Sequence, residues 1–213
     1  LAFGLVLTAA TMAFVIIAED VLGGGRMAVF DIAFATALQD ASTPVWQRFF
    51  VLVSWLGQGW VLAILAVLVA VVLLVRGQTE LAIAWLAAQA GGGLLNRALK
   101  ETFERTRPDF ADPVLASASW SFPSGHAMGT FILCGLGCYI LARETRSWTV
   151  GAVAVTAGVA WCVVMAFSRL YLGVHYASDV TAGIVAGAAW VAVCASRVEV
   201  LLRRTAVSAF ARR

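Results

Sequence analysis

The stretch 123–142, PSGHAMGTFILCGLGCYILA, places a polar turn directly before an apolar run of helical length. A helix needs about 20 mostly apolar residues to cross the hydrocarbon core of a bilayer. Further segments of that order occur along the chain, and the predicted spans are residues 1–18, 58–75, 79–99, 125–142, 148–167 and 177–196. The pattern predicts an all-α, polytopic membrane helix bundle with six transmembrane helices.

The composition is that of an integral membrane protein. Of 213 residues, 62% are hydrophobic and 13% are charged, whereas charged residues make up about 25% of soluble domains. The length suits one domain and no polar linker divides the chain, so residues 1–213 are expected to form a single membrane-embedded domain. The net charge of +3 is too small to indicate a nucleic-acid partner.

The distribution of arginine predicts the orientation in the membrane, because cytoplasmic loops carry an excess of Arg and Lys. At one end of the spans, basic residues outnumber acidic ones: Arg76, Arg143, Arg146, Arg197, Arg203, Arg204, Arg212 and Arg213. At the other end, acidic residues outnumber basic ones. Six spans place both termini on the basic side, so the termini are expected to be cytoplasmic.

A short helix is predicted between the first two spans. Residues 26–40 carry one apolar stripe at helical spacing, formed by Phe30, Ala33, Phe34, Ala37 and Leu38. Asp31, Gln39 and Asp40 lie off this stripe. The pattern fits an interfacial helix on the outer leaflet, and it fits equally a helix that packs over the outer mouth of the bundle.

Small residues recur at close-packing positions. The patterns are Gly91-Gly92-Gly93 and Gly183-x-x-x-Gly187, and small residues at such spacing let membrane helices approach each other closely. We expect these glycines to pack within the bundle rather than between two copies of the chain. The oligomeric state does not follow from them.

The two histidines of the chain, His126 and His175, each lie in a polar cluster that interrupts apolar sequence. The clusters are residues 100–108, 123–126 and 168–179. In a six-span layout all three fall at the outer ends of the spans. Since imidazole exchanges protons and attacks electrophiles near neutral pH, this convergence predicts one catalytic site.

His175 and Asp179 are four residues apart, so at the start of a helix they share one face. A carboxylate on one ring nitrogen fixes the tautomer and leaves the other nitrogen free to react. His175 is therefore the candidate nucleophile and Asp179 the residue that orients it. A structural histidine capped by its neighbour is the alternative reading of this pair.

Basic residues and a helix start complete the candidate site. Lys100, Arg107 and Arg169 are three cations that can hold a tetrahedral oxyanion, although each could also be a solvated loop charge. Ser124 and Gly125 precede the fourth span, where a helix N-terminus presents free N–H groups to an anion. His126 in that first turn is placed to protonate a leaving oxygen.

These residues resemble the signatures of the type 2 phosphatidic acid phosphatase (PAP2) family, Lys-x6-Arg-Pro, Pro-Ser-Gly-His and Ser-Arg-x5-His-x3-Asp. Here they read Lys100 to Pro108, Pro123 to His126 and Ser168 to Asp179, complete and in order. The resemblance implies that His175 forms a phosphohistidine, that Asp179 orients it, and that His126 protonates the leaving group. It further implies that the phosphoryl oxygens are held by Lys100, Arg107, Ser124, Gly125 and Arg169.

The resemblance also implies a single membrane phosphatase domain that needs no metal or other cofactor. The expected reaction is hydrolysis of a lipid phosphate or diphosphate at the outer face of a bacterial cytoplasmic membrane. Undecaprenyl diphosphate, phosphatidylglycerophosphate, phosphatidate and lipid A share the phosphate that the motifs would bind, so the motifs do not choose among them. A lipid phosphotransferase with a hydroxyl acceptor, a vanadium haloperoxidase-like enzyme and a non-catalytic lipid binder are the alternatives.

Overall fold

The structure, a computed structural model, describes residues 2–108, 119–145 and 147–210, and residues 201–210 by their backbone alone. In these ranges every regular element is an α-helix, which confirms the all-α prediction there. The helices are α1 (Ala2–Leu22), α2 (Arg26–Asp40), α3 (Pro44–Leu56), α4 (Gly59–Val75), α5 (Thr79–Phe103), α6 (Gly125–Thr145), α7 (Trp148–Tyr171) and α8 (Ala177–Phe210).

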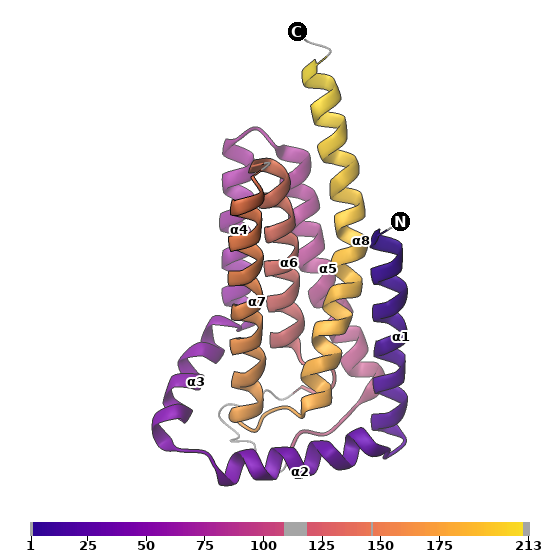
Figure 1. Cartoon of the computed structure of the whole chain (residues 1–213), viewed down its shortest axis with the longest axis vertical. Coiled ribbons are helices and arrows are strands. Elements are labelled where there is room, and N and C mark those ends of the chain that lie inside the picture. The colour runs from indigo at the N-terminus through magenta and orange to yellow at the C-terminus, as the bar shows by residue number, and fades with distance from the viewer. Residues whose placement is uncertain (1, 109–118, 146, 211–213) are drawn as a thin grey trace.

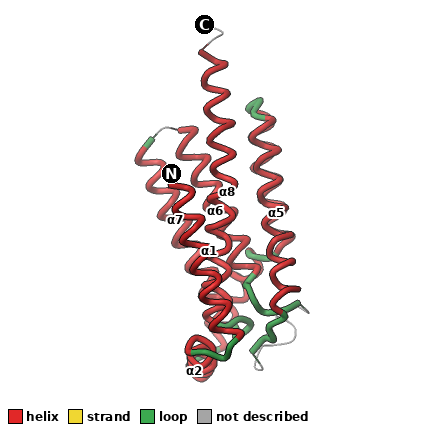
Figure 2. Tube along the Cα trace, turned by 90° about the vertical axis from the view of Figure 1, so that its right-hand side faces the viewer, coloured by secondary structure: helices red, strands yellow, loops and turns green. Residues whose placement is uncertain are grey.

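Six of these helices, α1 and α4 to α8, run along the long axis of the molecule (Figure 1). Helix α6 lies inside the bundle, in contact with α4, α5, α7 and α8. Helix α2 crosses one end of the bundle, and Figure 2 shows it at that same end after a 90° turn. Helix α1 begins and α8 ends on the side away from α2.

Four helices are long and apolar enough to cross a membrane: α1, α6, α7 and the part of α8 up to Val200. Helices α3 and α4 meet at a bend of 47° and pass the same test together, so the described residues hold five candidate spans if this pair counts as one. Helix α4 alone has 17 residues. Helix α5 carries the polar residues Gln89, Asn96, Arg97 and Lys100, which lower its hydropathy. The count of six spans therefore stays a prediction.

Helix α3 was not predicted as a separate element. It begins with a proline at its first turn, after the extended residue Thr43, and it ends at Gly57. A Cβ atom at position 57 would lie 2.6 Å from Sδ of Met165 and 2.7 Å from Cδ2 of His126. A side chain at position 57 would therefore require Met165 and His126 to move, and the break between α3 and α4 brings backbone against the ring of His126.

The predicted helix over residues 26–40 is present as α2, with the same bounds. Its buried residues are Asp31 and Ala35, while Phe30 of the predicted apolar stripe is 58% exposed. The side chain of Gln39 donates a hydrogen bond to the carbonyl of Tyr171 at 2.9 Å. Helix α2 thus packs over the mouth of the bundle through the face that carries Asp31. Of the predicted apolar stripe, Phe30, Ala33 and Ala37 are exposed, whereas Leu38 packs against the buried cluster of Phe50, Tyr171, Leu172 and Val174.

Four glycines of the two small-residue patterns pack within the chain, whereas Gly93 is exposed and a Cβ there would meet no heavy atom within 4 Å. A Cβ at Gly183 would lie 2.6 Å from the carbonyl oxygen of Ser124, and a Cβ at Gly187 would lie 3.2 Å from that of Met128. Gly91 lies against Trp190 in a similar way. Small residues on α8 therefore let the start of α6 approach it closely, which positions Ser124 and the residues after it.

The basic end of the bundle lies opposite α2. Arg76 caps α4 and Arg143 lies in the last turn of α6, and both helices end away from α2 (Figure 1). Arg143 forms an ion pair with Glu199 at 2.7 Å. Of the arginines used for the predicted orientation, Arg146, Arg212 and Arg213 and the side chains of Arg203 and Arg204 lie outside the described residues.

Candidate active site

A cavity of about 1020 Å³ is lined by polar motif residues and by apolar residues of α4 and α5. The motif residues that line it come from the end of α5, the loop after it, the start of α6, the end of α7 and the turn before α8: Lys100, Arg107, Gly125, His126, Arg169 and His175. Both histidines and all three motif cations therefore meet in one cavity, although they are spread over 76 positions from residue 100 to residue 175.

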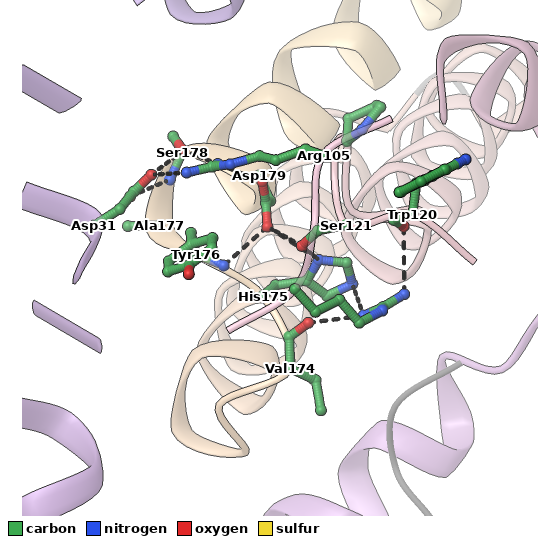
Figure 3. Close-up of polar contacts among 12 residues, drawn as sticks. Asp31, Arg105, Trp120, Ser121, Val174, His175, Tyr176, Ala177, Ser178 and Asp179 are labelled. Atoms are coloured by element: carbon green, nitrogen blue, oxygen red, sulfur yellow. Dashed lines mark hydrogen bonds and ion pairs between the residues drawn. The ribbon is translucent and has the colours of Figure 1, made fainter. Parts of the chain in front are cut away.

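The carboxylate of Asp179 lies behind His175, in the first turn of α8 (Figure 3). Its Oδ2 is 3.4 Å from Nδ1 of the histidine and accepts a hydrogen bond from the main-chain N–H of Tyr176 at 2.9 Å. The hydroxyl of Ser121 donates to the same oxygen and lies 3.3 Å from Nδ1. Asp179 and His175 are both buried.

The other ring nitrogen of His175 faces Arg107, with Nη1 of the arginine 3.3 Å from Nε2. A guanidinium only donates hydrogen bonds, so Nε2 must accept and the ring proton lies on Nδ1, towards Asp179. Burial lowers the pKa of His175 to about 3, although Asp179 acts in the opposite direction. The ring is therefore neutral at pH 7, and the lone pair of Nε2 points to the cavity.

Arg107 is held by main-chain oxygens. Its Nη1 donates to the carbonyl of Val174 at 2.7 Å and its Nε to that of Ser119 at 3.0 Å. Burial lowers the pKa of Arg107 from its usual value, with Asp179 opposing the shift. The planar guanidinium thus has a fixed position beside Nε2 of His175, suited to a phosphoryl group bound there.

Lys100 and Arg169 supply the other positive charges. The ammonium of Lys100 donates to the carbonyl oxygens of Trp120 and Ser121. Arg169 is 3% exposed and donates from Nη1 to the hydroxyl of Ser54 in α3. Among the described residues, neither these two cations nor Arg107 lies within 4.0 Å of a carboxylate. Buried cations without a carboxylate favour an anionic ligand.

The start of α6 brings further polar atoms to the cavity. The N–H of Ser124 donates to the carbonyl of Asp179 at 2.9 Å, which ties α6 to α8. Three polar atoms of the motif residues are buried without a hydrogen-bond partner among the described residues: Oγ of Ser124, Nε2 of His126 and Nε of Arg169. Unsatisfied buried polar groups are rare in folded proteins, and each of these atoms can bind a phosphate oxygen or a leaving oxygen.

Sequence reasoning missed four polar residues around Asp179. Arg105 donates from Nη1 to Oδ1 of Asp179 at 2.6 Å and from Nη2 to Oδ2 of Asp31 at 2.9 Å. Ser121 contacts Asp179 as described above, and the main-chain N–H of Ser178 donates to Asp31 at 3.0 Å. A usable signal was present, because Asp31 is the one charged residue between Met27 and Gln39 of an otherwise apolar helix.

Within the described part of the chain, no group of three or more His, Cys, Asp or Glu residues is arranged to hold a metal ion. That the reaction needs no metal stays a prediction from the resemblance.

The family model for the PAP2 superfamily matches residues 81–202, a range that contains every residue of the cavity lining except those between Gly57 and Val67. This is more than half of the chain. The chain belongs to the PAP2 superfamily. The three motifs of the sequence analysis all lie inside the matched range, so the predicted resemblance is confirmed.

Two curated relatives match part of the chain. Phosphatidylglycerophosphatase B of Bacillus subtilis is 43% identical over 96 residues, which cover 44% of this chain and 46% of the relative. Decaprenylphosphoryl-5-phosphoribose phosphatase of Mycolicibacterium smegmatis is 36% identical over 105 residues, or 46% of this chain and 52% of the relative. The alignments thus span about half the length of these relatives.

Two solved structures are similar to most of the chain. The transmembrane PAP2-type phosphatidylglycerolphosphate phosphatase from Bacillus subtilis superposes with a TM-score of 0.82 at 27% identity, over 91% of this chain and 96% of that one. LpxE of Aquifex aeolicus shares the fold, with a TM-score of 0.56 at 23% identity over 78% of this chain and 92% of that one. Together with the apolar helices, this similarity shows an integral membrane protein.

Proposed function

We propose that this PAP2 protein is a membrane phosphatase, one domain over residues 1–213, that hydrolyses a lipid phosphomonoester or diphosphate through a phosphohistidine at His175. The observation that carries the proposal is that the two ring nitrogens of His175 have different surroundings. Its Nδ1 faces Asp179 at 3.4 Å, and its Nε2 faces the cavity beside Arg107 at 3.3 Å. A neutral imidazole oriented in this way is a nucleophile directed at an oxyanion site.

In the first step, Nε2 of His175 attacks phosphorus and forms the P–N bond while the bond from phosphorus to the lipid oxygen breaks. The imidazole becomes positively charged, and the carboxylate of Asp179 stabilises that charge. His126 gives its Nε2 proton to the leaving oxygen. His126 is therefore positively charged before this step, and the negative charge of the bound phosphate stabilises its protonated ring.

In the second step, water attacks phosphorus and the P–N bond breaks. His126, left neutral by the first step, accepts a proton from the water and returns to its protonated form. Cleavage of the P–N bond returns His175 to its neutral form. Through both steps Lys100, Arg107 and Arg169 bind the phosphoryl oxygens, together with the N–H groups at the start of α6 and the hydroxyl of Ser124. No metal or other cofactor takes part.

The lipid tail is proposed to lie between α4 and α5. From the cationic end the cavity extends along apolar residues of both helices, including Leu62, Val67 and Leu86. A substrate anchored in the bilayer could then present its phosphate to the site without leaving the membrane. The first substrate to test is phosphatidylglycerophosphate, since the relative with 43% identity over the aligned residues is a phosphatidylglycerophosphatase.

We further propose six membrane spans, formed by α1 and α4 to α8, in a bacterial cytoplasmic membrane. The described arginines Arg76 and Arg143 lie at the end away from the cavity, which favours cytoplasmic termini and a site that faces the periplasm or exterior. Reaction of an engineered cysteine at exposed Asp40 with a membrane-impermeant thiol reagent in intact cells tests this orientation. Labelling only after lysis would contradict it.

The activity is tested by phosphate release from purified protein in detergent, with no acceptor alcohol present. The panel contains phosphatidylglycerophosphate, phosphatidate, undecaprenyl diphosphate and lipid A, each assayed with and without EDTA. We expect release from at least one lipid, unchanged by EDTA and lost in His175→Ala. Release that appears only when an alcohol is added would show a phosphotransferase, and halide oxidation by vanadate-loaded protein would show haloperoxidase chemistry. Wild-type protein that releases no phosphate from the panel would contradict the proposal.

A further inference from the structure

A chain of buried ionic contacts links α2 to the site (Figure 3). Arg105 bridges two carboxylates, Asp179 at 2.6 Å and Asp31 at 2.9 Å. The Asp31 side chain is 1% exposed and that of Asp179 is 0% exposed. These three residues come from α2, the loop after α5 and the first turn of α8, so they join segments up to 148 positions apart.

The geometry at Asp179 separates the roles of its two oxygens. Arg105 binds Oδ1, and the groups that share Oδ2 are the ring of His175, the hydroxyl of Ser121 and the N–H of Tyr176. A carboxylate can rotate about its Cβ–Cγ bond. The guanidinium on Oδ1 opposes this rotation, and it also favours the ionised carboxylate that His175 needs when the ring becomes positively charged.

Asp31 in turn fixes Arg105. Its carboxylate binds Nη2 of the arginine and accepts hydrogen bonds from the main-chain N–H and the hydroxyl of Ser178. The guanidinium also lies over the ring of Tyr176, at 4.4 Å from its centroid. A planar fork with one carboxylate on each side has one orientation, which a lysine could not reproduce.

We propose that Arg105, anchored by Asp31 of α2, is a positioning residue that fixes the Asp179 carboxylate and through it the reactive tautomer of His175. This inference rests on the proposed function of His175 and gives α2 a part in the chemistry. Neither Arg105 nor Asp31 lines the cavity, so their loss should change kcat rather than substrate binding.

The test uses Arg105→Gln, Arg105→Lys and Asp31→Asn in the full chain. Arg105→Gln should lower kcat about 10- to 100-fold, the range typical of lost supporting groups, with little change in KM. Arg105→Lys keeps the positive charge, and its kcat should lie between those of Arg105→Gln and wild type. In Asp31→Asn the amide oxygen can still accept from the N–H of Ser178, so α2 stays anchored while the ion pair is lost. The matched control on the same helix is Asp40→Asn at an exposed position, which should leave kcat unchanged.

A double variant tests whether Asp31 acts through Arg105. If it does, Asp31→Asn should have almost no further effect in an Arg105→Gln background, because coupled residues are non-additive. If the loss in the double variant equals the product of the two single losses, Asp31 does not act through Arg105, and the proposed anchor is overturned.

The deciding readout is the tautomer of His175, measured by long-range 1H–15N correlation on protein labelled with 15N at histidine, with any affinity tag removed. The chain has two histidines, so a His126→Ala spectrum assigns both. In wild type the proton of His175 is expected on Nδ1, and Arg105→Gln should add the Nε2–H tautomer. An unchanged tautomer in Arg105→Gln would overturn the inference whatever its kcat. This readout needs no substrate, so it still decides the inference if the wild type releases no phosphate.

Discussion

Oδ2 of Asp179 lies 3.4 Å from Nδ1 of His175, while Nε2 on the other side of the ring faces Arg107 across 3.3 Å. The carboxylate and the cation thus bind opposite nitrogens of one buried imidazole. The first orients the ring, and the second marks where an oxyanion would be bound. The predictions below follow from this arrangement and from the packing around it.

Asp179→Asn should lower kcat by about 100-fold or more, the size of a general acid–base contribution. The amide can donate a hydrogen bond to Nδ1, which would move the ring proton to Nε2 and remove the nucleophilic lone pair. Phosphate release measured at saturating lipid checks the prediction. A variant that folds and keeps more than half of the wild-type kcat would show that the carboxylate does not orient the nucleophile.

His126→Ala should separate substrates by their leaving groups. With a natural lipid phosphate, kcat should fall about 10²- to 10⁴-fold, because an alkoxide leaves poorly without a proton. With p-nitrophenyl phosphate, whose leaving group needs no proton, the loss should be much smaller. Equal losses on the two substrates would argue against His126 as the general acid. His175→Ala is the control, since it should lose activity on both.

Acid should destabilise the fold partly through His175. Its pKa in the fold is about 3 because of burial, whereas an unfolded histidine titrates near 6.5. Between these pH values the unfolded chain binds a proton that the folded chain does not. This contribution to stability is therefore fully present above pH 6.5 and decreases as the pH falls towards 3.

Thermal unfolding in detergent at pH 7.5 and pH 4.5 checks this prediction, with His175→Asn as the comparison. The asparagine removes the titrating group, so its melting temperature should fall less between the two pH values than that of wild type. Equal falls in the two proteins would mean that His175 titrates normally in the fold.

Gly183→Ala should destabilise the protein by about 1–3 kcal/mol, the usual cost of overpacking. The added Cβ would lie 2.6 Å from the carbonyl oxygen of Ser124, so the start of α6 must move away from α8. The melting temperature checks the effect. Gly4→Ala is the matched control because no heavy atom lies within 4 Å of the added Cβ, and it should unfold no earlier than wild type. If both variants unfold at the wild-type temperature, this helix contact does not limit stability.

The sequence predicted those parts of the site in which the contacting residues lie close together in the chain. His175 and Asp179 are four residues apart at a helix start, and their contact follows from helical geometry. The bounds of α2 followed from its apolar period. Long apolar segments predicted helices, although the bend between α3 and α4 depends on backbone packed against His126, a contact between distant segments.

The parts that the sequence did not predict depend on tertiary contacts. Asp31 was predicted to lie off the apolar stripe of a helix that fitted the outer leaflet and the mouth of the bundle equally well. The face that carries Asp31 packs inward, where Arg105 and Ser178 bind its carboxylate. Nothing local relates Asp31 to a residue 74 positions later. Ser121 likewise reaches Asp179 from the far side of the site and lies outside the three motifs.

The central claim is tested most directly by trapping the covalent intermediate. Protein mixed with 32P-labelled lipid phosphate and quenched in alkali within milliseconds should retain label, since phosphohistidine is stable in base and labile in acid. Mass spectrometry of the digest should place the phosphate on the peptide that contains His175, and His175→Ala should retain none. Label on any other residue, or rapid lipid hydrolysis with no labelled protein at any quench time, would contradict the account.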